Sequence, residues 1–137
     1  MRALIVDDER LARKELMKLL EEHPSVEVVG EAMNADEAIQ LVNDLNPDLL
    51  FLDIQMPDLT GFEVIEQLNH KPNIIFTTAY EQYAVKAFDT FSIDYLLKPI
   101  KEERLQQSIE KLKNFGVLNQ SFDLFSLQEV IKQLQTP

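Results

Sequence analysis

The chain has 137 residues, 45% hydrophobic and 27% charged, which fits one globular domain with a full core and leaves little room for a second domain. It has no cysteine and two histidines, which excludes disulfides and thiolate metal sites and argues against a zinc or iron centre. The formal net charge of −11 opposes binding to a polyanion, so we expect this chain not to contact nucleic acid.

Short apolar runs recur along the chain and predict five β-strands. The runs cover residues 3–6, 26–29, 49–52, 74–76 and 95–97. Between them, apolar residues such as Leu105, Ile109 and Leu112 follow helical spacing. Strands that alternate with helices predict an α/β fold, a doubly wound five-stranded parallel sheet with helices on both faces. Because Glu27 interrupts the second run, we place that strand at an edge, in the order 2-1-3-4-5.

The start of the chain leads directly into the first apolar run, whose four residues are too few for the core of a signal peptide. No other apolar stretch approaches the length that spans a membrane. We therefore expect a cytoplasmic protein without membrane association.

Two helix starts are marked by local sequence signals. Asn34 and Glu37 form a plausible capping pair for the second helix. Gly61 follows the turn at residues 56–60 and precedes the third helix. These signals predict where the helices that follow the second and third strands begin.

The end of the chain differs from the rest. Residues 1–115 contain all the alternating elements, whereas residues 116–137 predict a linker and a short amphipathic helix. Ser126 and Glu129 resemble a capping box. The apolar stripe of this helix contains Leu127, Val130, Ile131 and Leu134. It can pack on its own domain, pair with a second copy or lead into an output domain; we expect the chain to stop before such a domain.

Charged residues stand where three of the predicted strands end. Asp7 and Asp8 follow the first strand, Asp53 follows the third and Lys98 follows the fifth. Asp7 and Asp8 can also cap the first helix, since aspartate often caps helices. In parallel strands that lie side by side, however, these groups meet at one edge of the sheet, where sites form in open α/β folds.

Carboxylates drawn together repel one another and stay ionised only beside a compensating cation. Carboxylate and carbonyl oxygens suit Mg²⁺, so we expect Mg²⁺ as the cofactor. Asp53 can then act as a nucleophile toward phosphorus, while the Lys98 ammonium neutralises charge on the phosphoryl oxygens. Thr78 ends the fourth strand and can donate its hydroxyl to a phosphoryl oxygen.

These residues carry a family resemblance. Over about residues 1–115 the chain resembles a response-regulator receiver domain of two-component systems, which implies a flavodoxin-like fold. The matching motifs are Asp7-Asp8, Asp53 before Met56-Pro57 and Gly61, Thr78-Ala79, and Lys98-Pro99. Residues 76–100 are similar to the LytTR-type (LytR/AlgR) branch, whose receivers precede a DNA-binding domain.

The resemblance assigns roles at the acidic site. It implies that Asp53 accepts a phosphoryl group from a phosphohistidine of a sensor histidine kinase. Asp8, Asp53 and the backbone carbonyl of Gln55 hold Mg²⁺, and Asp7 assists through water. The chain is then a phosphorylatable switch and not an enzyme that turns over an external substrate.

Further roles concern the switch itself. Lys98 and Thr78 contact the phosphoryl group, and Tyr95 matches the family's switch aromatic. Phosphorylation is expected to remodel the surface around the fourth helix, the fifth strand and the fifth helix. The expected consequences are a phosphorylation-dependent homodimer and control of a missing C-terminal domain that binds DNA.

Gln55 and Tyr80 lie two residues after Asp53 and Thr78, at positions that vary within the family. They are expected to flank the path of the water that hydrolyses the acyl phosphate. A bulky Tyr80 can obstruct this path, so we expect slow self-dephosphorylation.

Three other functions are weaker alternatives. A phosphatase of the haloacid-dehalogenase type needs an acid two residues after its nucleophile, where this chain has Gln55. A flavin or nucleotide binder needs a phosphate loop after the first strand, where this chain has Asp7-Asp8-Glu9-Arg10. A scaffold receiver that is never phosphorylated would not need the complete set of pocket residues.

Overall fold

The computed structural model describes residues 1–83 and 92–117, and this part of the chain contains five β-strands in one sheet. The strands are β1 Arg2–Val6, β2 Glu27–Ala32, β3 Leu49–Asp53, β4 Asn73–Thr78 and β5 Asp94–Leu97. Neighbouring strands pair in parallel, in the order β2-β1-β3-β4-β5. The predicted doubly wound sheet and its strand order are confirmed.

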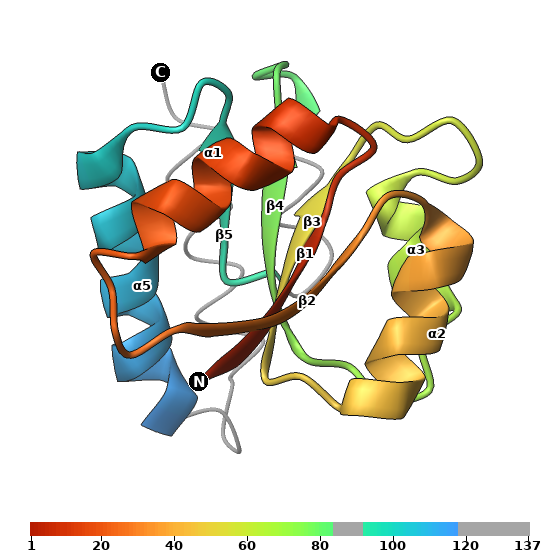
Figure 1. Cartoon of the computed structure of the whole chain (residues 1–137), viewed down its shortest axis with the longest axis horizontal. Coiled ribbons are helices and arrows are strands. Elements are labelled where there is room, and N and C mark those ends of the chain that lie inside the picture. Colours follow the sequence, from red (N-terminus) through yellow and green to blue (C-terminus); the bar gives the residue numbers. More distant parts are fainter. Residues whose placement is uncertain (84–91, 118–137) are drawn as a thin grey trace.

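Helices cover both faces of this sheet. The described helices are α1 Arg10–Leu20, α2 Ala35–Leu45, α3 Gly61–Glu66 and α5 Glu102–Val117. Helices α1 and α5 lie on one face, and α2 and α3 lie on the other (Figure 1). The central strand β3 therefore has a separate apolar core on each side.

The two cores divide the side chains of β3 by alternation. Leu49 and Phe51 pack with residues of α1 and α5, whereas Leu50 and Leu52 pack with residues of α2 and α3. All four side chains are buried. Because successive strand residues point to opposite faces, an uninterrupted apolar run is the pattern that such a double-sided strand requires.

The second strand differs from its predicted range. The apolar run predicts a strand over 26–29, whereas β2 pairs with β1 from Glu27 to Ala32. The register shifts between Ala3 and Leu4, and Gly30 then lies opposite Leu4. Strand pairing uses backbone groups, so β2 continues through Gly30 and Glu31 although neither has a large apolar side chain. Its predicted edge position is confirmed.

The start of α2 follows the predicted capping signal. The Asn34 side chain accepts a hydrogen bond from the Glu37 backbone N–H at 2.8 Å. The Glu37 carboxylate accepts from the backbone N–H of Met33 at 3.1 Å, one residue before the cap. The helix is therefore capped as expected, although the reciprocal bond uses the preceding peptide.

The start of α3 packs against the end of β3. Thr60 and Glu63 form a capping box, which was not among the predicted helix starts. Gly61 is the first residue of the helix, and a Cβ atom there would lie 2.7 Å from the backbone oxygen of Asp53. Glycine thus allows the close approach that sets the loop between Asp53 and α3.

The predicted C-terminal segment falls mostly beyond this description. Helix α5 is described over Glu102–Val117, and the short amphipathic helix predicted within 116–137 falls mostly on residues outside this description. Its role and the domain boundary at residue 115 stay predictions. Among the described helices, none has the length and apolar character needed to cross a bilayer.

Candidate functional site

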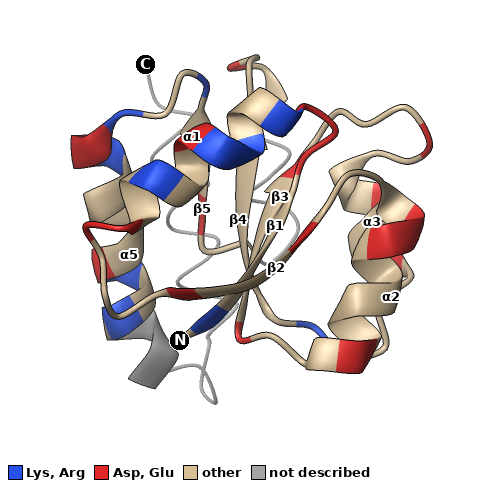
Figure 2. Cartoon of the chain, in the orientation of Figure 1, with Lys and Arg blue, Asp and Glu red and all other residues tan. Residues whose placement is uncertain are grey.

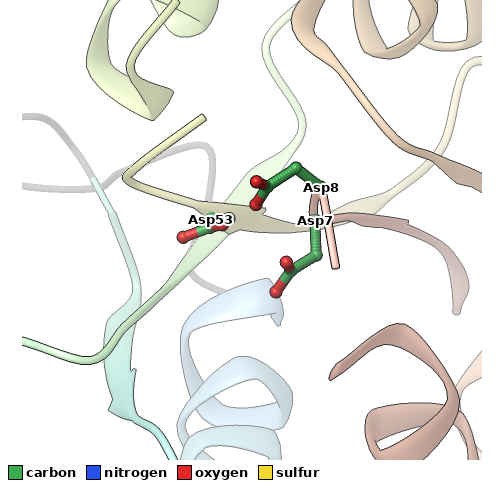
Figure 3. Close-up of side chains that lie close together, drawn as sticks. All are labelled: Asp7, Asp8 and Asp53. Atoms are coloured by element: carbon green, nitrogen blue, oxygen red, sulfur yellow. The ribbon is translucent and has the colours of Figure 1, made fainter. Parts of the chain in front are cut away.

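The acidic residues predicted from the strand ends come together at the carboxyl edge of the sheet. Asp53 is the last residue of β3, and Asp7 and Asp8 directly follow β1. One carboxylate oxygen from each lies within 4.8 Å of the others. Figure 3 shows the three side chains gathered at this edge. Together with Lys98, which follows β5, we call them the acid pocket.

Lys98 binds two of these carboxylates. Its Nζ lies 2.7 Å from Oδ2 of Asp7 and 3.6 Å from Oδ2 of Asp53. Asp7 and Asp53 are buried, whereas Asp8 is exposed. The ammonium is therefore held nearer to Asp7 than to Asp53.

Neither Asp7 nor Asp8 occupies the N-cap position of α1, the alternative role considered for them. The N-cap position of α1 is Glu9, and its side chain makes no capping hydrogen bond. Asp7 accepts a hydrogen bond from the Glu9 backbone N–H at 2.9 Å through Oδ1, while Oδ2 faces Lys98. The pair thus closes the turn after β1 and also contributes carboxylates to the acid pocket.

The Asp53 carboxyl is short of compensating charge. Burial, together with the negative charge of Asp7, raises the pKa of Asp53 to about 7. Lys98 and the Gln55 backbone N–H, which donates to Asp53 Oδ1 at 3.1 Å, oppose this rise without cancelling it. A further cation beside Asp53 would favour the ionised carboxylate.

Lys98, unlike Asp53, is held in its charged form. Burial by itself lowers the pKa of this ammonium, but the hydrogen bond to Asp7 and the charge of Asp53 outweigh burial and raise its pKa. Lys98 therefore stays charged at neutral pH. It supplies a fixed positive group beside the candidate nucleophile.

The end of β4 borders the pocket on the other side of β3. Thr78 is buried, and its Oγ1 accepts a hydrogen bond from the Tyr80 backbone N–H at 3.1 Å. The Thr78 carbonyl accepts from the Lys98 backbone N–H at 2.7 Å. The predicted Thr78 and Lys98 are therefore tied together through the backbone, next to the strand that carries Asp53.

The two residues expected to tune dephosphorylation are both exposed. The exposed fraction of Tyr80 is 47%, and its ring meets that of Tyr83 edge-on, with 6.2 Å between centroids. The Gln55 side-chain Nε2 donates to the Tyr83 hydroxyl at 3.3 Å. Tyr83 was not singled out from the sequence, because an isolated tyrosine carries no recognisable signal of such a contact.

A buried ionic network lies under β5 and was also not predicted. Asp94 is fully buried and accepts hydrogen bonds from Nη1 and Nη2 of Arg104 at 2.8 and 2.7 Å. The Ser108 hydroxyl donates to it at 2.6 Å, and Lys111 Nζ lies 3.4 Å away. Arg104 also donates to the Tyr95 carbonyl at 3.0 Å, and its guanidinium lies 5.4 Å from the Tyr95 ring centroid.

We call Asp94, Arg104, Ser108 and Lys111 the β5–α5 network. A single aspartate before an apolar run reads as a strand boundary, which is why Asp94 was overlooked. The available signal was the helical spacing of Arg104, Ser108 and Lys111, which places them on one face of α5. That face carries the partners of a buried acid.

Charge is distributed unevenly between the two faces of the sheet. The ribbons of α1 and α5 carry both basic and acidic residues, whereas α2 and α3 carry acidic residues without Lys or Arg (Figure 2).

A cavity of about 330 Å³ lies on the α1 side of the acid pocket. Its lining includes Asp7, Leu11, Ala12, Lys98, Pro99 and Ile100.

Comparison with known proteins defines the class. Residues 3–110 match the family described as the response regulator receiver domain, and the chain belongs to this family. Such domains are phosphorylatable switches that work with sensor histidine kinases. The predicted resemblance is thereby confirmed at the level of the receiver domain.

Curated relatives extend beyond this chain. The transcriptional regulatory protein BtsR of Salmonella typhi is 51% identical over 114 residues, which are 82% of this chain and 48% of that protein. An uncharacterized response regulatory protein of Vibrio cholerae is 48% identical over 112 residues, 80% of this chain and 47% of that protein. The chain thus spans about half the length of the curated relatives it matches.

Solved structures agree with the fold. The response regulatory domain of mrkE from Klebsiella pneumoniae is 38% identical, with a TM-score of 0.74 over 83% of this chain and 96% of that one. The REC domain of AraT, a response regulator from Geobacillus stearothermophilus, is 30% identical, with a TM-score of 0.76 over 87% and 97%. A two-component response regulator of the LuxR family from Aurantimonas is 29% identical, with a TM-score of 0.73 over 81% and 83%.

Proposed function

We propose that this chain is the phosphoacceptor domain of a two-component response regulator, in which Asp53 takes a phosphoryl group from a sensor histidine kinase. One observation carries the proposal: three carboxylates from two strand ends meet within 4.8 Å, and Lys98 reaches two of them. Family membership supports the same function.

The donor atoms of the acid pocket fit Mg²⁺. The residues that would hold it are Asp8, Asp53 and the backbone carbonyl of Gln55, with Asp7 acting through water. The raised pKa of Asp53 indicates a site that a divalent cation would stabilise. When bound, Mg²⁺ neutralises charge on the phosphoryl oxygens.

The transfer step uses groups that the fold holds in place. A carboxylate oxygen of Asp53 forms a bond to phosphorus, the P–N bond of the phosphohistidine breaks, and the electron pair returns to the imidazole. The Lys98 ammonium lies 3.6 Å from Asp53 and can attract the transferred oxygens. The Thr78 hydroxyl, whose oxygen accepts a hydrogen bond from the Tyr80 backbone N–H, can donate its own proton to the same oxygens.

The phosphoryl group adds about two negative charges and three acceptor oxygens at Asp53. As Thr78 moves toward these oxygens, the space it leaves can be filled by Tyr95, which packs partly buried against the core on the α2 and α3 side. The surface proposed to change includes β5 and α5. The predicted fourth helix belongs to the segment between β4 and β5, where residues 84–91 lie outside the described residues. This switch is proposed to favour a homodimer.

The output function is proposed from the relatives. Several are named transcriptional regulatory proteins, and the chain spans about half of their length. We propose that a DNA-binding domain follows in the intact protein and that phosphorylation controls transcription. The LytTR branch stays a prediction from residues 76–100; two of the similar structures are of LuxR-family regulators.

Phosphorylation can be tested on the purified chain. With acetyl phosphate and Mg²⁺, intact mass should rise by about 80 Da, the mass of one phosphoryl group. Asp53→Asn should remain at its starting mass, and omission of Mg²⁺ should suppress the adduct in the wild type. An adduct of equal yield in Asp53→Asn would contradict the assignment.

The proposed dimer has a separate test. Sedimentation with a beryllofluoride mimic of the phosphoryl group should show self-association that is absent without the mimic. Identical monomer signals under both conditions would remove dimerisation from the proposal while leaving the phosphoacceptor role intact.

Gln55 and Tyr80 are proposed to tune the lifetime of the acyl phosphate. The Tyr80 ring is exposed next to Thr78, a position from which it can limit the approach of water. Tyr80→Ala should therefore shorten the half-life of phospho-Asp53 in Mg²⁺. An unchanged or longer half-life would contradict shielding by Tyr80.

A further inference from the structure

A side-chain bridge joins the segments that follow β3 and β4, the two neighbouring strands that end beside the acid pocket. On the β3 side, the backbone N–H of Gln55 donates to Asp53 Oδ1 at 3.1 Å, which places Gln55 beside the nucleophile. Its side-chain Nε2 then donates to the hydroxyl of Tyr83, on the β4 side, at 3.3 Å. The bridge therefore begins at a residue whose backbone is hydrogen-bonded to Asp53.

The Tyr83 end of the bridge is anchored. The Tyr83 ring packs against the apolar core on the α2 and α3 side. Its backbone N–H donates to the Tyr80 carbonyl at 3.3 Å, and the Tyr80 ring meets the Tyr83 ring edge-on. A ring held by the core presents its hydroxyl at a defined place. Gln55, by contrast, is exposed and carries a flexible side chain.

We propose that Tyr83 is a positioning residue that holds the Gln55 amide across the β4 side of the acid pocket and thereby slows the loss of the phosphoryl group from Asp53. The inference rests on the proposed phosphoacceptor function and deepens it. Carboxylates of Asp7 and Asp8 border the pocket on the β1 side, so the bridge restricts the side that they leave open.

The reaction that the bridge slows is hydrolysis. A water oxygen forms a bond to phosphorus, the bond between phosphorus and the Asp53 oxygen breaks, and its electron pair restores the carboxylate. The other product is dihydrogen phosphate, which keeps both hydrogens of the water. The attacking oxygen must arrive opposite the breaking bond, so a side chain fixed over the pocket limits the productive approaches.

The test follows the half-life of phospho-Asp53. The chain is phosphorylated with acetyl phosphate and Mg²⁺, the donor is removed, and loss of the adduct is followed by intact mass. Tyr83→Phe keeps the ring and deletes the hydroxyl; it should shorten the half-life about two- to tenfold, the range of one hydrogen bond. Gln55→Leu should shorten it similarly, and the double variant should be no faster than the faster single variant.

A matched control is Gln106→Leu, which removes an exposed amide that donates to Glu110 at 3.4 Å, on α5. It should leave the half-life unchanged, and the thermal midpoint of Tyr83→Phe should match that of the wild type. An unchanged half-life in Tyr83→Phe, or full additivity with Gln55→Leu, would overturn the positioning role while leaving Asp53 phosphorylation established. Absence of any adduct in the wild type would overturn both proposals.

Discussion

Two buried aspartates of the same sheet, Asp53 and Asp94, have pKa values that are shifted in opposite directions. Asp53 is 3% exposed at the end of β3, and Asp94 is 0% exposed at the start of β5. The pKa of Asp53 is raised to about 7, whereas that of Asp94 is lowered. Burial acts in the same direction on both, so the difference lies in their partners.

The partners differ in number and in geometry. Burial by itself raises the pKa of Asp94, but hydrogen bonds from Arg104 and Ser108, with the charge of Lys111, reverse the shift. Asp53 shares the Lys98 ammonium with Asp7, and the ammonium lies closer to Asp7. The β5–α5 network is therefore electrostatically complete, and the acid pocket is short of positive charge. The incompletely compensated negative charge of Asp53 thus distinguishes the acid pocket, as a candidate binding site, from the structural ion pairs of Asp94.

The largest expected effect on the free energy of unfolding concerns the β5–α5 network, where the charge of the buried acid is compensated. Asp94→Asn should lower the free energy of unfolding by about 3 kcal/mol at pH 7, because it leaves the guanidinium of Arg104 without its carboxylate. The folded-state pKa of Asp94 lies below 3.8, so its stabilisation is present above pH 3.8 and is lost as pH falls toward the folded-state pKa. Urea unfolding at several pH values would measure both. A loss independent of pH would contradict the ionic account.

In the acid pocket, the same kind of substitution is expected to stabilise the protein. Asp53→Asn should raise the free energy of unfolding, on the order of 2 kcal/mol at pH 8 without divalent ions. The folded-state pKa of Asp53 is raised from 3.8 to about 7, so the cost of its charge is absent below pH 3.8 and complete above pH 7. The same urea series should therefore show no gain at acid pH. A destabilised Asp53→Asn at pH 8 would contradict the shortage of positive charge.

A divalent cation should supply the positive charge that the acid pocket lacks. At ten times its dissociation constant, Mg²⁺ should raise the free energy of unfolding of the wild type by about 1.4 kcal/mol through binding to the folded state. Asp94→Asn should keep this gain, whereas Asp53→Asn and Asp8→Asn should lose most of it. Thermal unfolding with Mg²⁺ and with a chelator measures the gain. Equal gains in all four proteins would show that the ion binds elsewhere.

The smallest effect should come from the outer cation of the β5–α5 network. Lys111 is 42% exposed in its side chain and lies 3.4 Å from Asp94, so Lys111→Met should cost less than about 1 kcal/mol. Urea unfolding beside Asp94→Asn would compare the two. A cost as large as that of Asp94→Asn would mean that Lys111, and not Arg104 with Ser108, compensates the acid.

Much of the fold followed from the sequence because buried parallel strands have uninterrupted apolar runs. The residues of β3 are the clearest case, since both of its faces are covered. The edge strand β2 was the least predictable, because Gly30 and Glu31 pair through the backbone although neither continues the apolar run. The capping box of Thr60 and Glu63 was present in the sequence but overlooked.

The acid pocket was predictable because acids at the carboxyl ends of neighbouring parallel strands must converge. Asp7, Asp8, Asp53 and Lys98 were predicted to meet, and the structure brings these four together. The finer geometry was not predictable, since spacing along the chain does not tell which carboxylate holds an ammonium. The bridge from Gln55 and the β5–α5 network depend on the orientation of side chains across loops and helices, which no strand pattern encodes.

The most direct test of the comparison is a carboxyl NMR titration of Asp53 and Asp94 in one sample. In the absence of divalent ions, Asp53 should titrate near pH 7 and Asp94 below pH 3.8. Addition of Mg²⁺ should lower the pKa of Asp53 and leave that of Asp94 unchanged. An Asp53 pKa near 3.8 that does not respond to Mg²⁺ would contradict the claim that the acid pocket is built to receive a cation and a phosphoryl group.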